Sequence, residues 1–96
     1  MYGMTQEREA KILEGAIDKY GKAAQTDMAI EEMAELTKAL LKYRRYPSPL
    51  ALESILEEMA DVSIMLNQLQ LMYGDPVDWE IAKLERLEDN LWKTHG

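Results

Sequence analysis

Two short acidic runs that lie inside apolar helix stripes constrain the fold of this chain more than any other feature. Residues 31–35 read Glu-Glu-Met-Ala-Glu, and residues 57–61 read Glu-Glu-Met-Ala-Asp. Side chains three positions apart in a helix project from the same side, so each run directs a pair of carboxylates among Met and Leu side chains. The four inward carboxylates are those of Glu32, Glu35, Glu58 and Asp61. Burying them together is unfavourable unless something positive joins them. The pattern therefore predicts two packed helices with a divalent cation between them.

The composition favours helix along nearly the whole chain. Leu, Ala, Glu, Met and Lys dominate, and β-branched residues are few among the 96 residues, which is typical of helical proteins. A chain of this length forms one domain. We therefore predict a single all-α domain over residues 1–96.

Glycine and proline divide this domain into four predicted helices. Thr5 and Ser48 are expected N-caps, and Thr26 is the expected start of the second helix. The breaks fall at Gly21, at residues 46–49 and at residues 74–76. The expected helices cover about residues 5–20, 26–45, 49–73 and 76–93, and the tail 94–96 is expected to fray.

The connections between these helices are short, which favours antiparallel neighbours in a four-helix bundle. The third helix is apolar over a wide arc, with Leu, Ile, Met or Val at ten of its positions between 55 and 72. One small bundle does not need so much apolar surface. The surplus predicts a subunit interface, and hence a homo-oligomer.

The charge of the chain excludes some classes of partner. Eighteen acidic and 11 basic residues give a net charge of −7, whereas binding nucleic acid or an anionic membrane needs a basic face. No apolar run approaches the about 20 residues that span a bilayer, and residues 1–9 lack the pattern of a signal peptide. The absence of Cys fits a cytoplasmic protein.

The chemistry of the ligands in the predicted site limits which metal ions it would bind. Carboxylate oxygens are hard ligands, which Mg²⁺ or Mn²⁺ prefers. A di-iron bundle would need Glu-x-x-His pairs, and the single His is His95 in the tail. The competing interpretation is an ordinary acidic helix face in contact with water, and a single Glu-x-x-Glu pair would not favour a metal site over it. Two such pairs within apolar stripes favour Mg²⁺.

The double acidic motif resembles the signature of the MazG-like nucleotide pyrophosphohydrolases of the all-alpha NTP pyrophosphatase superfamily. That signature is Glu-Glu-x-x-Glu followed by Glu-x-x-Asp after a variable spacer, and it matches residues 31–35 and 58–61 here. The resemblance covers about residues 17–92, including the proline-containing link and a basic motif in the last helix. It implies a four-helix core, Mg²⁺ dependence, a homodimer or homotetramer, and hydrolysis of a (d)NTP to (d)NMP and pyrophosphate by attack of a metal-activated water on the α-phosphate.

The resemblance also assigns roles to residues of this chain. The implied metal ligands are Glu32, Glu35, Glu58 and Asp61. Catalysis falls to Glu31 and Glu32, with Glu31 orienting or deprotonating the attacking water. Lys83 and Arg86, three apart in the last helix, form a predicted phosphate clamp; ordinary surface pairing is the alternative.

Two further features have competing interpretations. Tyr43 projects near the direction of Glu32 and is a candidate for stacking on the base, although an aromatic side chain at helical spacing is more often part of a core. The second helix ends in a basic group made of Lys38, Lys42, Arg44 and Arg45. We interpret this group as complementing the negative end of the helix dipole.

Two other functions remain open from the sequence. One is a non-catalytic helical oligomerisation module whose acidic residues keep it soluble. The other is a related pyrophosphohydrolase that acts on a phosphoribosyl nucleotide. The preference for base and sugar and the number of metal ions stay open as well.

Overall fold

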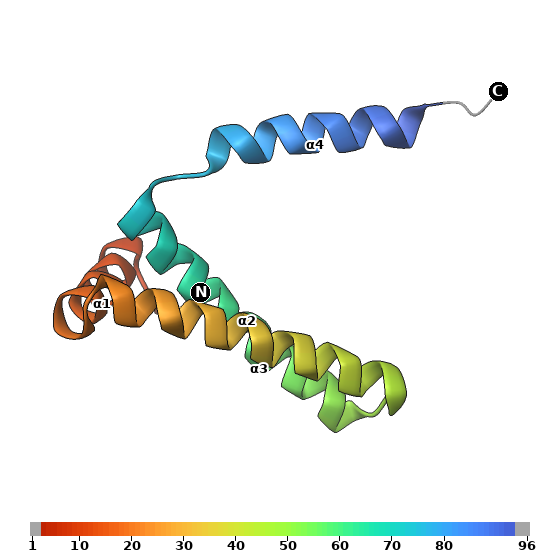
Figure 1. The fold of residues 1–96 in the computed structure, drawn as a ribbon, viewed down its shortest axis with the longest axis horizontal. Coiled ribbons are helices and arrows are strands. Elements are labelled where there is room, and N and C mark those ends of the chain that lie inside the picture. The colour runs from red at the N-terminus through yellow and green to blue at the C-terminus, as the bar shows by residue number, and fades with distance from the viewer. Residues whose placement is uncertain (1–2, 94–96) are drawn as a thin grey trace.

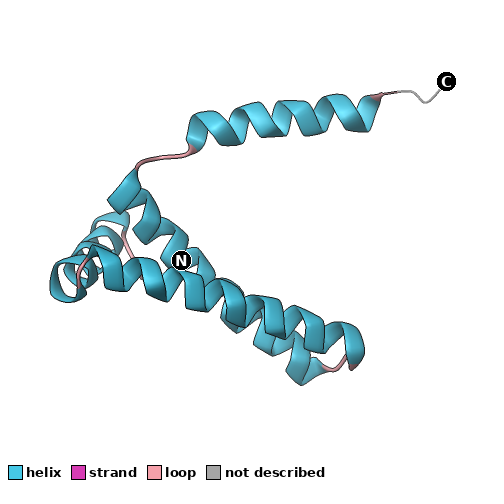
Figure 2. Cartoon of the chain, viewed as in Figure 1, coloured by secondary structure: helices cyan, strands magenta, loops and turns pink. Residues whose placement is uncertain are grey.

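The computed structural model describes residues 3–93, and this part of the chain contains four α-helices and no strand (Figures 1 and 2). The helices are α1 (Gln6–Tyr20), α2 (Lys22–Arg45), α3 (Pro49–Tyr73) and α4 (Val77–Trp92). The predicted all-α fold is confirmed. No helix among the described residues is both long and apolar enough to cross a membrane.

The helix ends follow the local signals of the sequence at most positions. The Thr5 hydroxyl accepts a hydrogen bond from the Arg8 amide at 3.0 Å, and the Ser48 hydroxyl accepts one from the Ala51 amide at 3.0 Å. These bonds satisfy amides that have no partner within the helix. Gly74, at φ 124°, ends α3. The predicted caps of α1 and α3 are confirmed.

The start of α2 differs from the prediction. The helix begins at Lys22, directly after Gly21, which takes a φ of 92° at the sharp turn. Thr26 does not cap the helix, because its hydroxyl lies 2.8 Å from the Lys22 carbonyl and 2.8 Å from the hydroxyl of Tyr73. The Lys22 ammonium lies 4.5 Å from the centre of the Tyr73 ring. These contacts with α3 hold the extra turn of α2 in place.

The packed part of the chain consists of α1, α2 and α3. Only residues 46–48 separate α2 from α3, so the two helices form a long antiparallel hairpin, and α1 packs against both (Figure 1). Asn67 of α3 donates a hydrogen bond to Glu9 of α1 at 3.2 Å. Half of the buried apolar residues in this thin core are alanines, and such small side chains favour close packing of helices. Its buried apolar residues are Leu13, Ala29, Ala39, Ala51, Ile55 and Met65.

The last helix, α4, stands apart from the other three. It makes no contact with α1, α2 or α3 within residues 3–93, and Figure 1 shows it extending away from the hairpin. None of its residues is buried. Its Val, Ile and Leu side chains share one side of the helix and are 47–67% exposed; they are Val77, Ile81, Leu84, Leu87 and Leu91. A single chain therefore packs three helices against one another. The predicted bundle of four helices would need a partner surface for α4.

Candidate metal centre

Three carboxylates meet in the middle of the α2–α3 hairpin. Glu32 comes from α2, and Glu58 and Asp61 come from α3, one turn apart. One carboxylate oxygen from each of the three lies within 4.8 Å of the other two, and all three residues are half-buried. The structure thus brings together three of the four metal ligands predicted from the sequence.

The surrounding core explains why these acids face one another. Ala29, which is 1% exposed, lies one turn before Glu32 on α2, and buried Ile55 lies one turn before Glu58 on α3. Residues at this spacing share one side of a helix, so the apolar contacts that join the hairpin also direct the carboxylates into it.

The electrostatics of Glu32 reflect this crowding. Burial raises the pKa of the Glu32 carboxyl above its ordinary value of 4.5, and the negative charge of Asp61 and a hydrogen bond with the Asp61 side chain raise this pKa further. Glu58 and Glu35 add to the rise. Glu32 is therefore harder to ionise in the folded chain than in water.

The pKa of Glu58 is raised as well, and one of its carboxylate oxygens lacks a hydrogen-bond partner among the described residues. Burial is again the main cause of its raised pKa, followed by the charges of Asp61, Glu35 and Glu57, while Lys38 partly offsets the rise. Its Oε2 atom is buried and has no hydrogen-bond partner among the described residues. A buried oxygen without a partner is costly, and a hard cation would supply one. The donor set fits Mg²⁺ or Mn²⁺.

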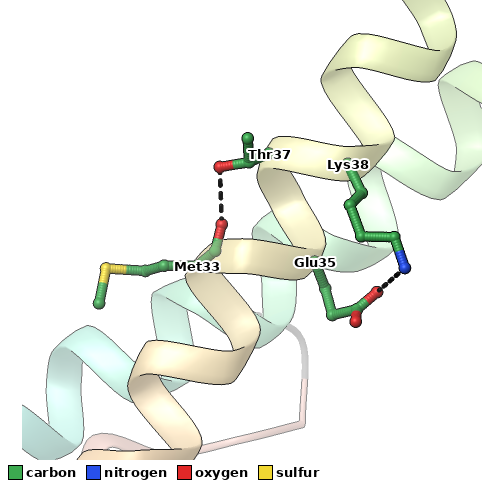
Figure 3. A network of polar contacts seen from close by, with 4 residues as sticks. All are labelled: Met33, Glu35, Thr37 and Lys38. Carbon is green, nitrogen blue, oxygen red and sulfur yellow. Dashed lines mark hydrogen bonds and ion pairs between the residues drawn. The ribbon is translucent and has the colours of Figure 1, made fainter.

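Glu35, the fourth predicted ligand, points elsewhere. Its side chain is 51% exposed, and its Oε2 atom lies 3.8 Å from the Lys38 Nζ atom (Figure 3). In Figure 3 this ion pair lies on one side of α2, and the hydrogen bond from the Thr37 hydroxyl to the Met33 carbonyl, 3.0 Å long, lies on the other. Glu35 is still close enough for its charge to raise the pKa of both Glu32 and Glu58.

The remaining predicted site residues lie outside the carboxylate cluster. Glu31 is exposed on α2. Tyr43 is half-buried, 11 residues after Glu32, which is about 16 Å along a helix axis. Lys83 and Arg86 are exposed on α4, which contacts no other described helix, so one chain does not bring them to the cluster.

A hollow that sequence reasoning did not identify lies between α2 and α3, next to the cluster. We call it the α2–α3 hollow. It is lined by Glu35, Lys38, Ala39, Leu41, Lys42, Arg45, Tyr46, Ser54 and Glu58. The signal for it was present in the sequence, because positions 35, 38, 42 and 45 recur at alternating steps of three and four and so share one side of α2.

Comparison with known proteins gives no match: no protein-family model, no curated protein and no solved structure matches this chain.

Proposed function

We propose that this protein is a Mg²⁺-dependent nucleoside triphosphate pyrophosphohydrolase, which converts a (d)NTP and water to a (d)NMP and pyrophosphate. The observation that carries the proposal is the cluster of Glu32, Glu58 and Asp61, which come from two helices. The Glu58 Oε2 atom in this cluster is buried and has no hydrogen-bond partner within residues 3–93. The resemblance of the acidic motifs to those of MazG-like enzymes supplies the reaction.

The chain's own residues have separate tasks in this proposal. Glu32, Glu58 and Asp61 would hold the ion, with Glu35 beside them. Bound Mg²⁺ neutralises charge on the phosphates and lowers the pKa of water. Glu31 would accept a proton from the water that attacks the α-phosphorus. The bond between the α-phosphorus and the bridging oxygen then breaks, and pyrophosphate leaves with the electron pair of that bond.

Measurement of pyrophosphate release tests this function. The panel contains canonical and modified NTPs and dNTPs, each assayed with Mg²⁺, with Mn²⁺ and with EDTA. We expect metal-dependent release with monophosphate as the co-product, and its loss in Asp61→Asn. Glu53→Gln is the matched control, because Glu53 is an exposed acid on the same helix outside the cluster. Wild-type turnover in Asp61→Asn would remove Asp61 from the site.

A homo-oligomer, dimeric or tetrameric, belongs to the same proposal. Two apolar faces support it: the side of α4 described above, and an outer side of α3 formed by Leu52, Leu56, Met59 and Leu66, all about half exposed. Exposed apolar surface on this scale is typical of a subunit interface. Lys83 and Arg86 would then reach an acidic cluster only from another copy of the chain.

These apolar faces equally favour the second candidate, a non-catalytic oligomerisation module. Such a module would form the oligomer but release no pyrophosphate from any nucleotide, and Mg²⁺ would not change its thermal stability. Adding a phosphoribosyl nucleotide to the substrate panel tests the related hydrolase.

A further inference from the structure

Three cations line the α2–α3 hollow on a single side of α2. Lys38, Lys42 and Arg45 form what we call the basic stripe. At about 100° per residue, the three positions fall within an arc of about 60°. Lys42 and Arg45 lie about 10 and about 15 Å beyond Glu35 along the helix axis. The stripe therefore extends in a line from the carboxylates toward the α2–α3 loop.

The hollow joins the stripe to the carboxylate cluster. Glu58 belongs to both, because it lines the hollow and is one of the three clustered acids. Ser54, one turn before Glu58, adds a hydroxyl to the α3 wall. A ligand in the hollow would thus contact a cation site at its inner end and the basic stripe along its length.

The basic stripe is only partly neutralised by the protein. Lys38 pairs with Glu35 at 3.8 Å, whereas neither Lys42 nor Arg45 forms an ion pair within residues 3–93. Complementing the helix dipole requires positive charge near the end of α2, but it does not require that charge to line a hollow beside the carboxylate cluster. In a chain of net charge −7, this arrangement fits a ligand that carries several negative charges in a row.

Linked phosphates have the required chemistry, because their oxygens bind both hard cations and the Lys and Arg donors. On the basis of the proposed function, we propose that the basic stripe binds the β- and γ-phosphates of the substrate, which become the leaving pyrophosphate. The phosphate chain runs from the carboxylate cluster toward the α2–α3 loop, and the nucleoside lies on the opposite side of the cluster. The site then selects triphosphates, because a monophosphate does not reach the stripe.

Binding of inorganic pyrophosphate tests this inference without turnover. Titration calorimetry in Mg²⁺ compares the wild type with Lys42→Gln, Arg45→Gln and the double variant. We expect each single change to weaken binding about tenfold, as loss of a charged hydrogen bond does. Arg44→Gln is the matched control: it removes the same charge one residue away, outside the residues that line the hollow, and we expect less than about a twofold change.

Steady-state kinetics separate a binding role from a merely structural one. The stripe variants should raise KM for the triphosphate, while inhibition by the monophosphate product stays at the wild-type level. An equal loss of pyrophosphate affinity in Arg44→Gln and Arg45→Gln would overturn the inference, because net charge alone would then explain it. Absence of pyrophosphate binding by the wild type would also overturn it.

The two proposals fail in different ways. If the wild type hydrolyses triphosphates and the stripe variants keep its KM, the function stands and the stripe assignment is wrong. If pyrophosphate binds through the stripe but no nucleotide is hydrolysed, the stripe assignment stands and the proposed reaction is wrong. Lys42 and Arg45 are exposed, so both variants should fold, and circular dichroism checks this.

Discussion

Replacing Glu58 by Gln should change thermal stability in opposite directions with and without Mg²⁺. In EDTA the variant should melt at a higher temperature than the wild type, because it removes a carboxylate whose ionisation is opposed by burial and by Asp61 and Glu35. In Mg²⁺ it should gain less from the ion, because it has lost one of three clustered ligands.

The size of the Mg²⁺ effect follows from mass action. An ion at ten times its Kd stabilises the folded state by about 1.4 kcal/mol, which raises Tm by roughly 6–11 °C in a domain of this size. If loss of one of three ligands weakens binding tenfold, the gain falls to about 0.4 kcal/mol, or roughly 2–3 °C. Differential scanning fluorimetry at fixed protein concentration measures both values.

The control for this experiment is Glu53→Gln, which should keep the full Mg²⁺ shift. The reasoning would be refuted by a Glu58→Gln variant that also keeps the full shift, since the carboxylate would then not hold the ion. A variant that melts below the wild type in EDTA would refute the electrostatic part, because removal of the crowded charge would have cost stability.

Two further predictions concern pH and assembly. Because the pKa values of Glu32 and Glu58 are raised, the folded chain binds more protons than the unfolded chain above the ordinary value of 4.5. In EDTA the free energy of unfolding should fall as pH rises from about 4.5 through the raised pKa values. In Mg²⁺, stabilisation by the ion should grow over the same pH range. Denaturant titration at several pH values measures both trends, and a free energy of unfolding that does not change with pH in EDTA would contradict the first trend. Leu84→Glu, on the exposed apolar side of α4, should dissociate the proposed oligomer without loss of helical circular dichroism. Light scattering after gel filtration measures the mass of the particle, and a mass equal to that of the wild type would contradict this prediction.

Local chemistry made much of this structure predictable from sequence. The hydroxyls of Thr5 and Ser48 cap helices through amides three residues away, so neighbouring residues suffice to place those ends. Glu58 and Asp61 share one side of α3 through helical periodicity alone, and an antiparallel hairpin brings Glu32 to them.

The features that were missed depend on contacts between distant segments. α2 starts four residues earlier than expected because Thr26 binds Tyr73, 47 residues later. Glu35 pairs with Lys38 rather than joining the cluster, and the spacing of the acids along the helix does not decide between these two arrangements. Positions 35, 38, 42 and 45 mark the α2 wall of the α2–α3 hollow in the sequence, but its α3 wall, with Ser54 and Glu58, is recognised only once the two helices pack together.

The small size of the side chains between α2 and α3 has a consequence for the proposed ion site. Ala29, Ala39 and Ala51 are all buried, so methyl groups help to set the separation of the two helix backbones. Every carboxylate in the cluster is anchored to one backbone or the other, so the same separation would limit how large an ion the carboxylates could enclose. Discrimination between Mg²⁺ and the larger Ca²⁺ would then depend in part on buried alanines that are not ligands of the ion.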